Sequence, residues 1–280
     1  MGRPSDLTQE QKEEIYSLYK QGYSSVKIGE IFNKSASCIM GYIKRAGIKS
    51  RSNKENSRVY NLDHDFFESI DSEEKAYWLG FIYADGYVTG TNKVGITLSS
   101  EDENHLLKFK EAIKATYPVN TYEIKHGYKP GNYCSRILVT SEKMRSDLIK
   151  HGCFCNKTNI ITAPNIDKRL SKHFIRGYLD GDGCITSTKR SESKSAEYAV
   201  KILGTDSLLD YIKEYIFNET QIVIGKYYKR RPEHIVSSLE LKGNIQVKKF
   251  LDSIYEESNI HLDRKYDKYL SLKSYYDGRA

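Results

Sequence analysis

Two aspartates follow the same local pattern at distant points of the 280-residue chain. Asp85 lies in the segment Tyr77-Trp-Leu-Gly-Phe-Ile-Tyr-Ala-Asp-Gly86, and Asp182 lies 97 residues (182 − 85) further on, in Phe174-Ile-Arg-Gly-Tyr-Leu-Asp-Gly-Asp-Gly183. A carboxylate at the C-terminal end of a helix faces the negative end of the helix dipole, which costs about 0.3–1 kcal/mol. Two such carboxylates side by side repel each other unless protons or cations lie between them. The pair therefore predicts a site for a divalent metal ion.

The residues before each aspartate predict a helix with one narrow face. Small residues lie one turn apart at Gly80 and Ala84 in the first segment and at Gly177 and Gly181 in the second. Residues four apart share a helix face, so another backbone can approach this side closely. We therefore expect the two helices to pack together and to bring both carboxylates to the same end. The glycine after each aspartate is expected to end its helix in the left-handed conformation.

The chain after each motif predicts the same order of elements twice. Hydrophobic alternation and helix periodicity give two strands, a helix, two strands and a helix after each motif helix. These elements are expected at 87–89, 94–99, 102–116, 119–126, 136–140 and 142–151 in the first half, and at 185–189, 198–204, 207–218, 222–230, 235–242 and 245–256 in the second. The predicted fold class is α+β, with two pseudo-symmetric αββαββα halves. Their four-stranded antiparallel sheets would form a saddle, joined at the two motif helices.

The paired motifs resemble those of the LAGLIDADG homing endonucleases, in the monomeric form that carries two copies in one chain. Residues 78–86 and 175–183 each fill the nine-residue motif and keep its glycines and its final Asp-Gly. Tyr83 stands where the motif has its first Asp, and Arg176 replaces its first Ala. The resemblance extends over roughly residues 72–273 through the pattern of elements. It implies a protein that cuts both strands of double-stranded DNA at a long target site.

The resemblance also implies a set of catalytic and metal-binding groups. Asp85 and Asp182 would each ligate Mg²⁺ (or Mn²⁺), with the carbonyl oxygens of Ala84 and Gly181 as further ligands. Mg²⁺ uses few protein carboxylates and keeps several waters, which suits so sparse a site. Lys157 and Lys265 resemble the basic residues that polarise water or the phosphate in this family. Strand alternation gives a further set of expected groove-reading residues: Thr89, Lys125, Arg136, Thr186, Thr188, Lys226, Tyr228 and Arg230.

The first sixty residues predict a three-helix unit. Thr8 and Gln11 are typical of a capping box, Ser24 or Ser25 and then Ser35 are expected to cap the next two helices, and Gly47 is expected to end the third. Expected core positions are Ile15, Leu18, Tyr19, Val26, Ile28, Ile31, Phe32, Ile39 and Ile43. Three short helices with tight turns favour a helix-turn-helix whose third helix enters the major groove. A small protein-interaction module is the alternative.

This segment also resembles the DNA-binding region of invertase and resolvase recombinases. The similarity lies in Gly2-Arg3-Pro4, which matches their minor-groove arm, in residues 22–33 and in Gly47-Ile48. It implies DNA binding and nothing about strand exchange. The expected DNA contacts are Arg3, Ser37, Cys38, Tyr42, Lys44, Arg45, Lys49 and Arg51.

Composition bounds the domain organisation and the class of protein. We expect a helix-turn-helix domain at 1–50, a polar linker at 51–70, and two motif repeats at 71–168 and 169–280. The chain carries 44 Lys and Arg against 37 Asp and Glu. The first 60 residues contain 11 of the basic and 6 of the acidic residues, so the positive charge is concentrated there.

The longest apolar stretch is about nine residues, against about 18 for a membrane span, so we expect no membrane partner. The five cysteines do not suggest a disulfide framework or a zinc site, and we expect a cytoplasmic monomer from a bacterial or phage-type context.

Two other functions fit the same sequence features. A helix-turn-helix joined to a LAGLIDADG-like domain is also compatible with a DNA-binding transcriptional regulator, although such proteins usually lose the two acids. An intron maturase would bind structured RNA on the same basic surface, which makes intron RNA a second candidate partner. The presence of both Asp85 and Asp182 favours cleavage of DNA.

Overall fold

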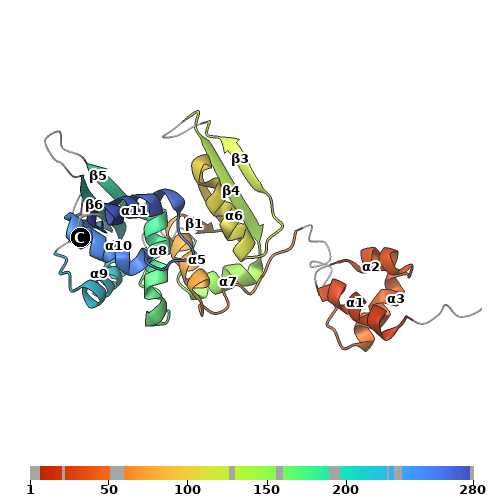
Figure 1. Cartoon of the computed structure of the whole chain (residues 1–280). Helices are drawn as coiled ribbons and strands as arrows, with labels where there is room; N and C mark the ends of the chain where they lie inside the picture. The colour runs from red at the N-terminus through yellow and green to blue at the C-terminus, as the bar shows by residue number, and fades with distance from the viewer. Residues whose placement is uncertain are drawn as a thin grey trace, which may run out of the picture. The chain divides into compact units, whose positions relative to one another are not determined.

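The computed structural model of the chain describes residues 7–20, 23–50, 60–125, 130–155, 160–188, 196–225, 227–229 and 235–277. The chain divides into two compact units, residues 1–61 and residues 62–280, here called the N-terminal and C-terminal units (Figure 1). Each is described by itself. No helix in the described ranges is both long and apolar enough to cross a bilayer.

The N-terminal unit is built from three short helices, α1 (Gln9–Lys20), α2 (Ser25–Phe32) and α3 (Ala36–Arg45). The predicted capping box is present: the Thr8 amide donates to Gln11 Oε1 (3.0 Å) and the Gln11 amide donates to Thr8 Oγ1 (3.2 Å). Ser24 and Ser35 cap α2 and α3 through their hydroxyl oxygens, as expected. Gly47 follows α3 with a φ of 71°, in the left-handed region.

The core of the N-terminal unit differs from the prediction on one helix. Its buried residues are Leu7, Ile15, Tyr19, Ile28, Ile39, Tyr42 and Ile43. Val26 and Ile31 of α2 were expected in this core but are 59% and 55% exposed. The buried stripe of α2 is centred on Ile28 and Gly29, so Val26 and Ile31 lie on either side of this stripe. A Cβ on Gly29 would overlap the carbonyl oxygen of Lys34, which shows how closely the turn into α3 folds back on α2.

The first half of the C-terminal unit has the predicted αββαββα order. Its elements are α5 (Glu73–Ala84), β1 (Gly86–Val88), β2 (Lys93–Ser99), the short 3-10 helix η1 (Ser100–Asp102), α6 (Glu103–Ala112), β3 (Val119–Glu123), β4 (Tyr133–Thr140) and α7 (Glu142–Lys150). The strands form one antiparallel sheet in the order β1-β2-β4-β3. Val94, Ile96, Ile137 and Val139 alternate along β2 and β4 and are buried on one face, leaving the other face open.

The second half follows this order with one strand fewer among the described residues and one helix more. Its elements are the 3-10 helix η3 (Lys168–Leu170), α8 (Ser171–Asp182), β5 (Cys184–Thr188), β6 (Glu197–Thr205), α9 (Asp206–Thr220), β7 (Val236–Lys242), α10 (Asn244–Tyr255) and α11 (Asp263–Asp277). The described strands pair antiparallel in the order β5-β6-β7.

The strand expected at 222–230 is not formed in the described part of that segment. It is reduced to a single bridge between Tyr228 and Ser238, which exchange two backbone hydrogen bonds of 3.0 and 2.8 Å. Ile222 and Ile224 are buried, and the Gly225 carbonyl accepts a hydrogen bond from Lys213 Nζ (3.2 Å) instead of joining a ladder.

The pair α5 and α8 forms the centre of the C-terminal unit. The two helices stand side by side, with the β1-β2-β4-β3 sheet on one side and the β5-β6-β7 sheet on the other (Figure 1). One continuous apolar cluster includes residues of both helices and both sheets. Helix α11 lies outside the predicted repeat and buries Tyr269 and Leu272 against this cluster.

Candidate active site

The close contact between α5 and α8 depends on the predicted small residues. A Cβ on Gly80 would overlap the carbonyl oxygen of Phe174, and a Cβ on Gly177 would overlap that of Tyr77. A Cβ on Gly181 would overlap the side chain of Ala84. The two helices therefore touch at three levels, at two of them backbone against backbone, and the predicted packing of the motif helices is confirmed.

This packing brings the two aspartates to adjoining helix ends. Asp182 is the last residue of α8, and Asp85 follows the last residue of α5. The position of a Cβ on Gly181 is only 3.4 Å from the backbone nitrogen of Asp85. Asp85 is half-buried and Asp182 is exposed, so both carboxylates lie where solvent or a ligand can approach. The predicted convergence of the two acids at one end is confirmed.

The glycines that follow these aspartates have a different role from the one expected. Gly183 has a φ of −78°, and neither it nor Gly86 is among the residues with positive φ. A Cβ on Gly86 would lie 2.7 Å from the Cα of Ile82, and one on Gly183 would lie 2.5 Å from the carbonyl oxygen of Leu179. Glycine is needed because the strand that begins here folds back onto the preceding helical turn. The left-handed helix ending was a wrong prediction at both positions.

The hydroxyl group of Tyr178 is buried close enough to both carboxylates for their charges to affect its pKa. Burial raises the pKa of Tyr178 well above its ordinary value, and the negative charges of Asp182 and Asp85 raise it further. Its hydroxyl donates to the Leu203 carbonyl at 2.8 Å. Tyr178 and Asp182 line a pocket of about 150 Å³ together with Tyr83, Ala84, Ile161, Leu203, Gly204 and Val236. The site thus combines two carboxylates with a small pocket at the junction of the two helices.

Lys265 occupies the carbonyl end of α8. Its ammonium group donates to the carbonyl oxygens of Leu179 (2.7 Å), Asp180 (2.7 Å) and Gly181 (3.0 Å). Burial lowers the pKa of Lys265 to about 8, although the nearby Asp180 carboxylate favours the charged form. The Gly181 carbonyl, a predicted metal ligand, thus already accepts one hydrogen bond. Lys157, the other predicted basic residue, lies outside the described residues.

The donor set at the helix ends suits a metal ion that needs few protein ligands. No group of three or more His, Cys, Asp or Glu side chains in the described ranges could hold a metal ion alone. Two carboxylates and nearby main-chain carbonyls are oxygen donors, and Mg²⁺ is commonly bound by one or two carboxylates together with water and substrate phosphates. The residues present therefore fit Mg²⁺ or Mn²⁺ shared with a phosphate, and do not form a closed structural site.

Comparison with known proteins identifies the fold. Residues 72–150 match the family model of the LAGLIDADG-like domain. The structure resembles the LAGLIDADG homing endonuclease I-GzeII in complex with its DNA target, with a TM-score of 0.51 and 12% identity over 75% of this chain and 92% of that chain. For the DNA-bound LAGLIDADG homing endonuclease I-LtrWI, the TM-score is 0.44 and the identity 14% over 76% of this chain and 92% of that chain. No curated protein sequence matches the chain.

The family match covers residues 72–150, which is less than half of the chain. The likeness to I-GzeII adds that the chain has the mixed fold with antiparallel sheets found in that endonuclease. At this level of identity it establishes the fold, and the function is argued below from the site.

The residues predicted to read DNA lie mainly on exposed surfaces of the C-terminal unit. Strand alternation places Thr89 and Arg136 on the open face of the first sheet, and Thr186 and Thr188 on the corresponding face of the second. Tyr228 is exposed beside β7, and Lys125 is exposed just after β3. Lys226 and Arg230 lie outside the described residues.

In the N-terminal unit, one predicted DNA contact is contradicted. Tyr42 is only 7% exposed, because its ring packs in the core with the Arg45 guanidinium 4.7 Å from the ring centre. The remaining predicted contacts divide as follows: Ser37, Lys44, Arg45 and Lys49 are exposed, Cys38 is half-buried, and Arg3 and Arg51 lie outside the described residues.

Sequence reasoning missed a charged cluster on the open face of the second sheet. Lys201 and Lys242 lie 3.2 and 2.9 Å from the carboxylate of Glu240 between them, and both lysines lower the pKa of that carboxyl. Strand alternation relative to the buried Val200 and Ile202 would have placed Lys201 on this face. The candidates in the second half came only from segments 185–189 and 222–230, so the strands that carry Lys201 and Lys242 contributed none.

Proposed function

We propose that the chain is a site-specific endonuclease of double-stranded DNA that hydrolyses one phosphodiester bond in each strand. The observation that carries this proposal is the convergence of Asp85 and Asp182 at adjoining ends of α5 and α8. Carboxylates at helix ends cost free energy in the isolated protein, so their pairing favours a bound cation. The likeness of the fold to a DNA-bound endonuclease supports the same conclusion.

Each carboxylate would hold a divalent ion, Mg²⁺ or Mn²⁺, near one scissile phosphate. The carbonyl oxygens of Ala84 and Gly181 are proposed as additional ligands. A bound ion would stabilise the negative charge that develops on the phosphate and the leaving oxygen. The contribution of the chain itself is geometric: the glycine contacts fix the two helix ends, and Lys265 compensates the partial negative charge of the α8 terminus. Lys157 is also proposed to act near a phosphate. Lys265, whose buried ammonium donates to three carbonyls, is proposed to act only through the end of α8.

The DNA would lie across the open faces of both sheets. These faces carry threonines, lysines and arginine, which suit hydrogen bonds to base edges and contacts to phosphates. We propose that the two halves are pseudo-symmetric repeats forming a saddle over the duplex, so that one chain acts as a monomer on both strands. The N-terminal unit would act as a helix-turn-helix that contacts a neighbouring stretch of DNA, which raises affinity through linkage.

The first experiment is a cleavage selection from a randomised duplex library. The protein is incubated with the library in Mg²⁺, in Ca²⁺ and with EDTA, and the cut ends are sequenced. The proposal expects Mg²⁺-dependent cuts in both strands of one long site. Recovery of bound DNA without cutting in any metal would contradict it, and would favour a transcriptional regulator or, if structured RNA is bound more tightly, a maturase.

The two aspartates are then tested on the selected site. Asp85→Asn and Asp182→Asn remove a negative charge without changing the shape of the side chain. Each should abolish double-strand cleavage while leaving DNA binding largely intact, as measured by plasmid linearisation and by gel shift. Full double-strand cleavage by either variant would refute the assignment of that carboxylate.

A further inference from the structure

Helix α8 contains two buried charged residues that its counterpart α5 lacks. Arg176 and Asp180 lie one turn apart and are 1% and 0% exposed. The corresponding residues of the first motif, 97 positions earlier, are Leu79 and Tyr83. An unpaired charge is too costly to bury, so each of these groups must have partners that belong to the second half or to the contact between the halves.

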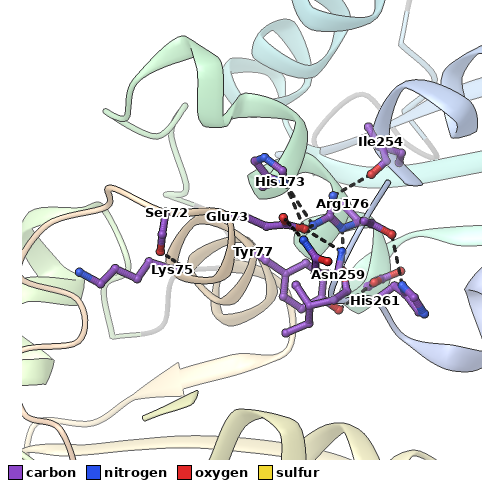
Figure 2. Close-up of polar contacts among 12 residues, drawn as sticks. Ser72, Glu73, Lys75, Tyr77, His173, Arg176, Ile254, Asn259 and His261 are labelled. Atoms are coloured by element: carbon purple, nitrogen blue, oxygen red, sulfur yellow. Dashed lines mark hydrogen bonds and ion pairs between the residues drawn. The ribbon is translucent and has the colours of Figure 1, made fainter. Parts of the chain in front are cut away.

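Arg176 ties three segments together. Its Nε donates to the Ile260 carbonyl (2.8 Å), its Nη1 to the Ile254 carbonyl (2.8 Å) and its Nη2 to the carboxylate of Glu73 on α5 (2.6 Å). Figure 2 shows its guanidinium between Glu73 and Ile254, with Asn259 alongside. The planar guanidinium offers five donors in a fixed geometry, so a single side chain can hold the end of α10, the segment after it and α5.

The same segment is held from two further sides. Glu73 accepts hydrogen bonds from the backbone amide of Asn259 (3.1 Å) and from its side-chain nitrogen (2.9 Å). Asp180 accepts from the Leu262 amide (2.8 Å) and from the hydroxyls of Tyr77 (2.8 Å) and Tyr255. Residues 256–262, which connect α10 to α11, are therefore held by the buried Arg176 and Asp180 of α8 and by the half-buried Glu73 of α5, an arrangement here called the clasp.

This connection determines where Lys265 lies. Lys265 is in the first turn of α11, three residues after Leu262, whose carbonyl accepts a hydrogen bond from the Lys265 amide (3.0 Å). Its ammonium group reaches the last three carbonyls before Asp182. A cation at the C-terminal end of a helix offsets the dipole there, so the clasp lowers the cost of placing the Asp182 carboxylate at this end.

We propose that Arg176 and Asp180 are positioning residues for Asp182, because they hold the α10–α11 connection that places Lys265 under the end of α8. This inference rests on the proposed function, and it adds that the clasp supports cleavage of one strand only. In α5, Leu79 packs in the apolar core and Tyr83 donates a single hydrogen bond to the His151 carbonyl. The Asp85 end is thus built without the Arg–Asp pair, and the two cuts should respond differently to its loss.

The test is strand-resolved cleavage of a plasmid that carries the selected site. Asp85→Asn and Asp182→Asn first identify which strand depends on each carboxylate. Arg176→Met should then slow the cut that Asp182→Asn removes by about 10–100-fold, because misplaced catalytic groups lose activity on this scale. With Arg176→Met, nicked plasmid should therefore accumulate in which only the strand that depends on Asp85 has been cut. The matched control is Leu79→Met, a volume-conserving change at the corresponding position of α5, which should leave both rates near those of the original protein.

A purely structural role for Arg176 would slow both cuts equally, and that result would overturn the proposal. Slowing confined to the Asp85-dependent strand would overturn it as well. If Arg176→Met does not fold, the same assay is made on Arg176→Lys, which keeps a charge opposite Glu73 but cannot reach both carbonyls. This variant should show a smaller slowing of the same strand, and equal rates for both strands would count against the clasp.

Hydrogen exchange of the full chain without DNA or metal gives a readout that does not depend on cleavage. Arg176→Met, or Arg176→Lys in its place, should speed amide exchange in residues 256–266 and in the last turn of α8, while the last turn of α5 keeps its protection. Unchanged exchange in 256–266 would overturn the clasp. If the unmodified chain cuts no DNA, the proposed function fails, and the exchange measurement still decides whether the clasp exists.

Discussion

Substitution of Gly177 by alanine tests whether the contact between α5 and α8 holds the C-terminal unit together. A Cβ at this position would overlap the carbonyl oxygen of Tyr77 and lie 2.9 Å from the backbone nitrogen of Phe81. Both atoms belong to the middle of a helix backbone, so no change of rotamer can relieve the overlap. Overpacking a core costs about 1–3 kcal/mol, and we expect the upper end of this range because a backbone must move. Alanine recovers about 1 kcal/mol through helix propensity, which leaves a net loss of about 2 kcal/mol.

The assay is thermal unfolding followed by the fluorescence of Trp78, the one tryptophan of the chain, which is buried on α5. In a unit of this size, a loss of about 2 kcal/mol lowers Tm by roughly 4–8 °C. The matched control is Gly90→Ala in an exposed turn, where an added Cβ meets nothing within 4 Å and Tm should stay within about a degree. A Tm of Gly177→Ala equal to or above that of the original protein would refute the view that the glycine contact is required.

Three further predictions concern other parts of the chain. Gly41→Ala in α3 should stabilise the N-terminal unit by about 0.5–1 kcal/mol, seen as slower amide exchange, because an added Cβ meets only the end of the Arg45 side chain at 3.8 Å. Burial lowers the pKa of His105 to about 3, so the folded C-terminal unit binds fewer protons than the unfolded chain at acidic pH. Its stability should fall by about 1.4 kcal/mol per pH unit below about pH 6, and His105→Gln should flatten this dependence in urea titrations at pH 6, 5 and 4. Alanine at Lys44, Arg45 and Lys49 together should reduce the slope of log K against log salt for DNA binding by about 2.7, measured by fluorescence anisotropy, and an unchanged slope would exclude phosphate contacts by these residues.

The parts of the structure that follow from local sequence rules could be predicted. Caps such as Ser24 and Ser35 and the small faces at Gly80 and Gly177 act within one turn or between two repeated segments, so their pattern is visible in the sequence. The first sheet was predicted because Val94, Ile96, Ile137 and Val139 alternate clearly with more polar neighbours.

The parts that depend on distant partners could not be predicted in the same way. Helix α11 buries Tyr269 and Leu272 but is otherwise mostly polar, so its periodicity is weak until the surface it covers is known. Arg176 looked like a departure from the motif, because its partners at Glu73, Ile254 and Ile260 lie far away in sequence. Tyr42 is an exception, because it lies three residues after Ile39 and one before Ile43, which is the spacing of a buried helix face, so its burial could have been predicted.

Residues in the contact between α5 and α8 affect both helices, whereas residues on the sides away from this contact affect mainly one. Gly80 lies against Phe174 and Gly177 against Tyr77, so a change on either helix displaces both helix ends at once. Leu79 is buried in the apolar cluster, whereas Arg176 donates to two carbonyls of its own half and reaches Glu73 at the start of α5. A substitution in the contact should therefore change the two strand cuts together, whereas a substitution on a flank should change one. Comparing Gly177→Ala with Arg176→Met, at adjacent positions of one helix, separates these effects: the ratio of the two cutting rates should stay constant in the first variant and shift in the second.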